Sequence, residues 1–221
     1  MVNFIKKFLF KRPKCISNYD LDYVANFNKA YEYTKELGLE LPKFNIDVSL
    51  YKDILDFDKA LGHNITVELF EKSNLQLEDL VANCFPMSLQ LQSYLGKRGI
   101  NSIITSGIVY DTTLNKAIFE EPKETIEYRL SNPSAEIHNP RFHTWITLEN
   151  LLVVDITLPA TLWFTLLKLN KSIERKNFQG IICVSPETNY QQNSYCYKPL
   201  FLGYDYFNKV KITPQLDIAI Y

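Results

Sequence analysis

The chain has 221 residues, of which 46% are hydrophobic and 22% charged, so it can bury one sizeable core and long disordered stretches are not expected. Its 24 basic and 25 acidic residues give a formal net charge of −1, which supplies no positive surface for binding phosphates. We therefore expect a single folded domain, residues 1–221, that does not bind nucleic acid.

The N-terminal segment is the one part of the sequence that suggests contact with a membrane. Residues 3–12 alternate apolar with basic side chains and predict a short amphipathic helix. This helix either packs on its own domain or makes a weak contact with a membrane surface. It lacks the small-residue cleavage site of a signal peptide, and no apolar run approaches the ~20 residues that cross a bilayer. No integral membrane segment is expected.

The cysteines and histidines do not follow the spacing of a disulfide framework or of a metal site. No CxxC pair is present, and reduced thiols in a cytoplasmic compartment fit this pattern best. We expect no metal and no cofactor. His63 and His138 both lie in turn-like contexts and are expected at the surface. The four cysteines are Cys15, Cys84, Cys183 and Cys196.

The first third of the chain reads as helical. Apolar residues at helical spacing predict helices over residues 18–37 and 47–61, and Gly38 and Gly62 end them. The stretch 65–72 fits a short helix or a strand equally well. We assign residues 1–75 to a helical extension and residues 76–221 to the core of the domain.

A further helix begins at Cys84. Asn83 can cap it, and Pro86 is tolerated in a first turn, where backbone amides have no helical partner. Its apolar residues continue for three or four turns, and Gly96 and Gly99 close it. It is predicted to pack on the sheet that follows.

The sequence changes character after this helix. Segments rich in β-branched and aromatic residues predict strands over 100–111, 124–130, 141–148 and 151–158, and a helix follows over 159–169. Residues 179–186 predict a short strand, and 198–207 and 209–214 an edge of the sheet. Helices followed by an antiparallel sheet indicate the α+β class.

Cys84 is the candidate nucleophile. At a helix start, the helix dipole and free amide hydrogens favour the thiolate over the thiol. The same amides can stabilise the oxyanion of a tetrahedral intermediate. The alternative is that Cys84 is a small buried core residue, as free cysteines commonly are.

His143 and Asp155 are candidates for the base and for the acid that orients it. They lie on two β-forming runs around Glu149 and Asn150, which predicts an antiparallel hairpin. Facing residues have a constant index sum, which for His143 and Asp155 centres on Glu149. A connection of three or five residues about this centre, or a bulge, would place His143 opposite Asp155 on one face. A two-residue turn would place them on opposite faces. A carboxylate within an apolar strand also needs a partner.

The segments NCFPMSLQLQSYLGKRGINSIITSGIVYD and FHTWITLENLLVVDITLP resemble the transglutaminase-like branch of the papain-fold cysteine enzymes. In that branch a cysteine opens a helix, and an H-x-W strand leads through a turn into a V-D-x-T strand. The resemblance covers residues 80–160 and assigns Cys84 as nucleophile and His143 as base. Trp145 matches the aromatic residue after the base, and Asp155 with Thr157 the final motif. It implies a papain-like core of a helix packed on an antiparallel sheet. Arylamine N-acetyltransferases share the order of these residues but carry R-G-G-x-C where this chain has VANC.

Together these patterns predict a cysteine-dependent acyl-transfer enzyme that acts on amide bonds of a protein or peptide through a thioester. Peptidase, amidase, deamidase and transglutaminase activities all stay open. Asn83, Gln76 and Trp145 are the candidates for oxyanion or substrate contacts. The alternatives are a catalytically inactive binding or scaffolding protein of the same fold and, third, an acyl-CoA-dependent transferase.

Overall fold

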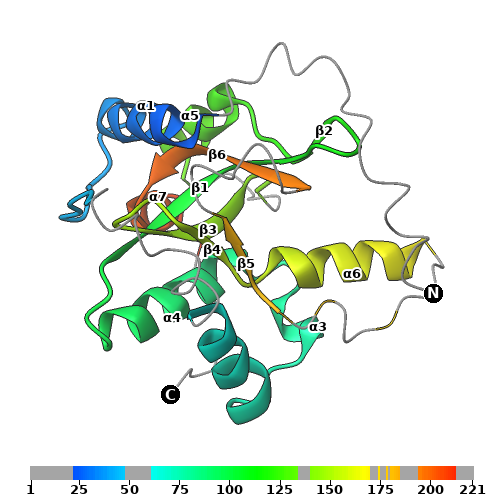
Figure 1. The fold of residues 1–221 in the computed structure, drawn as a ribbon. Coiled ribbons are helices and arrows are strands. Elements are labelled where there is room, and N and C mark those ends of the chain that lie inside the picture. Colours follow the sequence, from blue (N-terminus) through cyan, green and yellow to red (C-terminus); the bar gives the residue numbers. More distant parts are fainter. Residues whose placement is uncertain are drawn as a thin grey trace.

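A computed structural model describes residues 22–47, 61–133, 140–169, 180–184 and 194–212, together with residues 174 and 178. It confirms the α+β class, since an antiparallel sheet of six strands is packed with helices (Figure 1). The predicted helices over residues 3–12 and 47–61 fall largely outside the described residues, as do Cys15 and His138. Among the described helices, none is both long and apolar enough to cross a membrane.

The helices and strands follow one another as the sequence largely predicts. The helices are α1 (Tyr23–Glu36), the π-helix η3 (Val67–Lys72), α3 (Leu77–Leu80), α4 (Cys84–Gly96), α5 (Lys123–Ser131), α6 (Leu158–Lys168) and α7 (Asp205–Lys209). The strands are β1 (Ser102–Asp111), β2 (Lys116–Phe119), β3 (His143–Leu148), β4 (Val153–Asp155), β5 (Ile182–Val184) and β6 (Tyr195–Leu202). Residues 61–66 are helical and continue into η3, so the ambiguous stretch 65–72 is helical.

The central strand of the sheet is β1, which pairs with three others. Residues 105–111 pair with β6, residues 102–107 with β3, and residues 109–111 with β2. A strand has only two edges, so β2 and β3 must lie one after the other along the edge opposite β6. The end of β2 therefore meets the start of β3, which places Phe119 beside His143. The sheet continues from β3 through β4 to β5.

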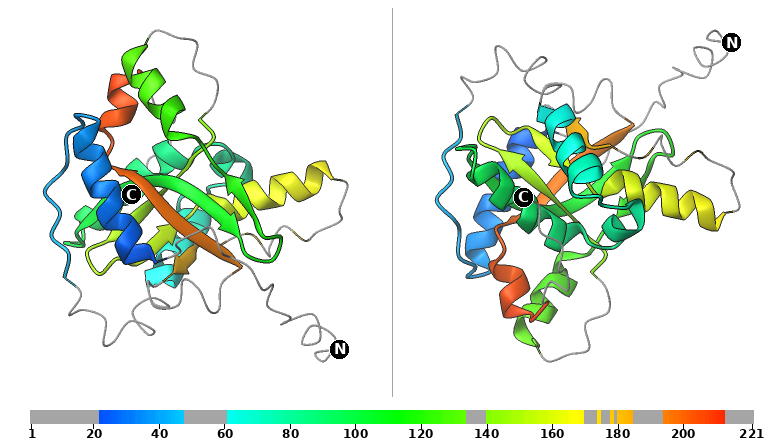
Figure 2. Two further views of the ribbon diagram at one scale, coloured as in Figure 1. Left: turned by 90° about the horizontal axis from the view of Figure 1, so that it is seen from above. Right: turned by 90° about the horizontal axis from the view of Figure 1, so that it is seen from below.

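The two faces of the sheet carry separate hydrophobic clusters. Helix α4 lies on one face with α3 and contributes Met87 and Leu91 to the larger cluster. Helix α1 lies on the other face, across β6, and contributes Tyr23 and Phe27 (Figures 1 and 2). Part of the segment that we assign to an N-terminal extension thus packs directly on the sheet. Helix α6 projects from one end of the sheet in all three views.

Gly107 allows close packing in the middle of β1. It faces His143 on β3 and Pro199 on β6, at an irregularity in the β1–β6 pairing. A Cβ atom here would collide with the Lys198 carbonyl oxygen and come within 2.9 Å of the Trp145 ring. Only a residue without a side chain lets the Trp145 ring pack directly over the strand.

Three predicted elements differ from the structure. Residues 124–130 form helix α5 and not a strand, because Pro122 starts a helix whose first turn holds Glu124, while only Ile126 of this helix is buried. Residues 205–209 form α7, so the predicted edge over 198–207 ends with β6 at Leu202. Residues 210–212, in the predicted edge 209–214, are not in a strand, and residues 213–214 lie outside the described residues.

Candidate active site

Cys84 is the first residue of α4, as the sequence predicts. The first helical hydrogen bond of α4 runs from the Met87 amide to the Asn83 carbonyl oxygen, 3.0 Å away. The amides of Cys84 and Phe85 therefore precede the hydrogen-bond ladder of the helix, and Pro86 has no amide hydrogen. The Cys84 side chain is half-buried, so its sulfur lies among protein atoms while the residue still reaches solvent.

The start of β3 supplies hydrogen-bond donors to the Cys84 sulfur. In the β3–β4 hairpin the Leu148 amide donates to the Leu152 carbonyl. Backbone amides along a strand point to alternate sides, so the amide of every second residue before Leu148, as far as Thr144, also points toward β4. Because β4 ends at Asp155, the Thr144 amide has no strand partner at this edge. This amide and the Thr144 hydroxyl lie close enough to the Cys84 thiol to lower its pKa. The Thr144 hydroxyl is also 3.1 Å from the Ser106 hydroxyl.

The β3–β4 hairpin brings His143 and Asp155 together. Its register pairs Ile146 with Val154, and residues 149–151 form a three-residue connection in which Leu151 adopts φ 62°. The predicted odd-length connection and shared face are confirmed. The predicted direct opposition is wrong, because the register places Asp155 across from Trp145, two residues along from His143. The contact is diagonal, and His143 Nε2 lies 2.7 Å from Asp155 Oδ2.

Every lone-pair direction of the Asp155 carboxylate faces a donor. Oδ1 accepts hydrogen bonds from the Thr157 amide (2.9 Å), the Thr157 hydroxyl (3.2 Å) and the Leu158 amide (3.0 Å). Oδ2 accepts from His143 and from the Tyr197 hydroxyl, 2.9 Å away. This geometry explains why Thr157 follows Asp155 by two residues and why β4 stops there: the carboxylate caps the turn that leads into α6.

The three side chains form a charged network. Burial lowers the pKa of His143, but the charge and hydrogen bond of Asp155, with a contribution from Cys84, outweigh it and raise the pKa to about 10. Burial raises the pKa of Cys84, yet the hydrogen bonds from His143 and Thr144 bring it below its ordinary value. The pKa of Asp155 is likewise lowered, because His143 and the amides after Asp155 outweigh the effect of burial. Each shift favours the charged form of its group: the thiolate of Cys84, the imidazolium of His143 and the carboxylate of Asp155.

His143 is enclosed by aromatic rings. The Phe119 ring is stacked on it at 4.7 Å between centroids, and the Trp145 ring lies 6.3 Å away on the same strand. His143 and Asp155 are each only 1% exposed. Since Nε2 faces Asp155, Nδ1 is the ring nitrogen left for Cys84. A reacting molecule must therefore approach through the Cys84 side.

The three candidates for oxyanion or substrate contacts have partners elsewhere. Asn83 occupies the N-cap position without a side-chain cap bond, and its amide donates to the Asp79 carbonyl instead (2.8 Å). The exposed Gln76 amide donates to Asn74 (3.0 Å). The buried Trp145 indole donates to the Tyr23 hydroxyl (2.9 Å) and so holds α1 on the sheet. The backbone amides of Cys84 and Phe85, in the first turn of α4, are therefore the hydrogen-bond donors closest in sequence to the Cys84 sulfur.

Three residues of the site were not predicted from the sequence. Tyr197, Thr144 and Phe119 come from β6, β3 and β2, and each contacts one member of the cluster. Tyr197 belongs to a tyrosine-rich stretch that reads simply as core. Its one signal is the alternation of tyrosines along β6, which puts Tyr195 and Tyr197 on one face.

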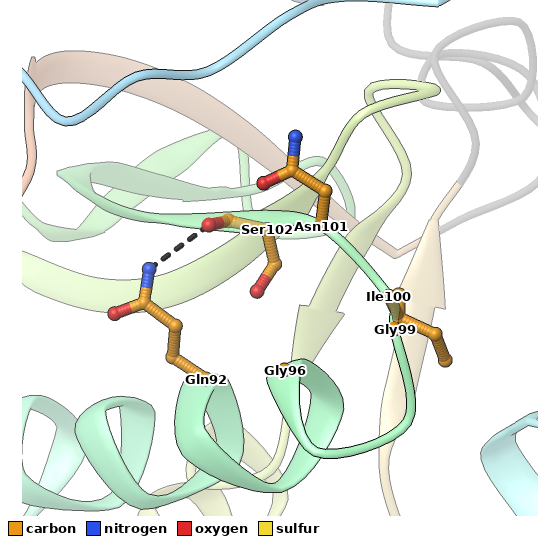
Figure 3. A pocket seen from close by; sticks show the side chains of 6 residues that line it. All are labelled: Gln92, Gly96, Gly99, Ile100, Asn101 and Ser102. Atoms are coloured by element: carbon orange, nitrogen blue, oxygen red, sulfur yellow. Dashed lines mark hydrogen bonds between the residues drawn. The ribbon is translucent and has the colours of Figure 1, made fainter.

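Other potential sites lie apart from this cluster. His63 is exposed, as predicted. Within the described ranges, no group of three or more metal-binding side chains is found. A pocket of about 310 Å³ is lined by Gln92 and Ser102 among others. Figure 3 shows these side chains and the hydrogen bond that the Gln92 amide donates to the Ser102 carbonyl. The pocket borders Gly96, about 18 Å along the helix from Cys84.

Comparison of the chain with protein family models, with curated proteins and with solved structures found no match.

Proposed function

We propose that this chain is a cysteine-dependent acyl-transfer enzyme that acts on an amide bond of a protein or peptide. The observation that carries the proposal is the 2.7 Å contact between His143 Nε2 and Asp155 Oδ2, at a histidine whose ring also interacts with the Cys84 thiol. The nucleophile is half-buried, while the base and the acid are closed off from solvent. This arrangement suits the transglutaminase-like branch of papain-fold enzymes that the sequence resembles.

Each residue has a separate part in the reaction. The Cys84 thiolate attacks the carbonyl carbon, and the amides of Cys84 and Phe85 stabilise the oxyanion that forms. The His143 imidazolium then gives its proton to the leaving amine as the C–N bond breaks, which leaves a thioester on Cys84. Neutral His143 next takes a proton from water or an acceptor amine that attacks the thioester. Release of the thiolate restores the starting ion pair.

Alkylation by iodoacetamide tests the nucleophile directly. Cys183 is the matched control, because it is also half-buried. At pH 6 we expect Cys84 to react at least about tenfold faster than Cys183, since each unit of lowered pKa gives tenfold more thiolate. The His143→Gln variant should remove this advantage. Mass spectrometry of tryptic peptides reports both sites in one sample, and equal labelling of the two cysteines would overturn the proposal.

The acyl-transfer step itself needs an activity assay. A library of peptide amides, offered with and without a primary amine, would separate hydrolysis from transamidation by the product formed. Cys84→Ala is the control in each case. Turnover that survives in Cys84→Ala would show that the activity belongs to another site or to a contaminant.

A further inference from the structure

Tyr197 makes a contact with the site that the proposed chemistry does not yet use. It lies on β6, whereas Asp155 lies on β4, and its side chain crosses the intervening strands to bring its hydroxyl within 2.9 Å of Asp155 Oδ2. Tyr197 is 0% exposed, and its ring packs edge to face against Trp145 at 5.0 Å. The phenol is therefore held in one position within the second hydrophobic cluster.

The phenol shares one carboxylate oxygen with the base. Oδ2 accepts hydrogen bonds from His143 Nε2 at 2.7 Å and from the Tyr197 hydroxyl at 2.9 Å, while Oδ1 is occupied by donors from Thr157 and Leu158. A carboxylate held by donors at both oxygens cannot rotate away from the imidazole. The second donor on Oδ2 also draws off some of the negative charge that would otherwise act on His143 alone.

We propose that Tyr197 is a positioning residue of this site, which fixes the Asp155 carboxylate and takes up part of its charge so that His143 can release its proton. This inference rests on the proposed function. Burial raises the pKa of Tyr197 well above its ordinary value, so the hydroxyl remains a donor at every pH at which the enzyme would work. An imidazolium that binds its proton too tightly is a poor acid for the leaving amine.

The test compares the His143 titration in wild type, Tyr197→Phe and Tyr195→Phe. Three histidines make the ring signals simple to follow by NMR, and Tyr195 is a control on the same strand that does not donate to Asp155. In Tyr197→Phe we expect the His143 titration to move to higher pH by roughly half a unit to one unit, because Oδ2 then interacts with the imidazolium more strongly. In Tyr195→Phe it should stay at the wild-type position.

A second measurement keeps the proposal testable if Tyr197→Phe does not fold. Incorporation of 3-fluorotyrosine at position 197 makes the phenol a stronger hydrogen-bond donor to Asp155 Oδ2. The His143 titration should therefore move to lower pH. A shift in the opposite direction, or none, would overturn the positioning role.

The outcomes separate this inference from the proposed function. If Cys84 in the wild type is alkylated no faster than Cys183, the proposed function fails and the role of Tyr197 fails with it. If wild-type Cys84 reacts fast but Tyr197→Phe lowers only the urea midpoint, with the His143 titration unmoved, Tyr197 is merely structural. The enzyme proposal would then stand without it.

Discussion

Among the residues that the structure describes, charged side chains are buried around Asp155 and around Glu121, and these two clusters differ in whether a proton can move. Glu121 is 3% exposed, forms an ion pair with the Arg129 guanidinium and accepts a hydrogen bond from the Arg141 amide, each at 2.8 Å. A guanidinium does not give up its proton in proteins, so this cluster can only hold segments together. The Asp155 cluster instead joins an imidazole to a thiol.

The comparison shows that a buried ion pair alone does not indicate a catalytic site. Both clusters contain a buried carboxylate that accepts hydrogen bonds from backbone amides. Only the Asp155 cluster contains a nucleophile, on a residue that is half-buried, and a base whose pKa is raised by a specific partner. The variants below test this difference from its largest expected effect to its smallest.

Asp155→Asn should have the largest effect, because it removes the charge that keeps His143 protonated. We expect alkylation of Cys84 at pH 6 to slow by about a hundredfold, and the free energy of unfolding to fall by about 3–5 kcal/mol. The raised pKa of His143 stabilises the fold fully below its unfolded pKa of about 6.5, and this contribution is lost as the pH rises through about 10. The stability difference from wild type should therefore narrow above pH 10.

Asp111→Asn is the matched control for this variant. Asp111 is also buried and also accepts backbone amides, those of Thr113 and Leu114, but it lies in the β1–β2 turn. Urea denaturation and mass spectrometry would be run on both variants. An equal loss of Cys84 reactivity in Asp111→Asn would mean that the effect comes from general destabilisation.

Glu121→Gln should lower the free energy of unfolding without changing the reactivity of Cys84. Removing one partner of a buried pair leaves the Arg129 charge without its counterion, and we expect a loss of about 3 kcal/mol in urea denaturation. Glu68→Gln, which breaks the ion pair with the exposed Lys72, should lower the urea midpoint much less than Glu121→Gln. The pH profile of Cys84 alkylation should match wild type in both variants. A shifted profile in Glu121→Gln would show that this pair reaches the site through Arg141, two residues before His143.

The parts of the site that depend on local sequence were predictable. The start of α4 at Cys84 follows from a helical pattern with Pro86 in its first turn, and the shared face of His143 and Asp155 follows from the parity of the hairpin. The diagonal register was not predictable, because Leu151 adopts a positive φ that is uncommon for leucine and moves the pairing by one residue on each strand. Helix α5 was missed because its β-branched and aromatic residues resemble a strand.

Contacts between distant strands could not be read from one sequence. Tyr197 lies 42 residues from Asp155, and only the order of β6, β1, β3 and β4 brings the two together. Phe119 reaches His143 because β2 and β3 follow one another along the same edge of β1. Asn83 was expected to cap α4 with its side chain. It makes no such cap bond, and its side-chain amide donates to the Asp79 carbonyl in the preceding turn instead.

Phe119→Leu should have the smallest effect of these variants, and the effect should appear in the His143 titration. The Phe119 ring is stacked on the His143 ring with 23° between the planes, and it is itself half-buried. Interaction of a cation with an aromatic face contributes about 0.5–1 kcal/mol, so its loss should lower the His143 titration by roughly half a pH unit. Phe119→Tyr keeps the ring and should hold the titration in place. If Phe119→Leu also leaves the titration in place, the ring serves only to cover the imidazole, and Asp155 with Cys84 keeps the proton on His143.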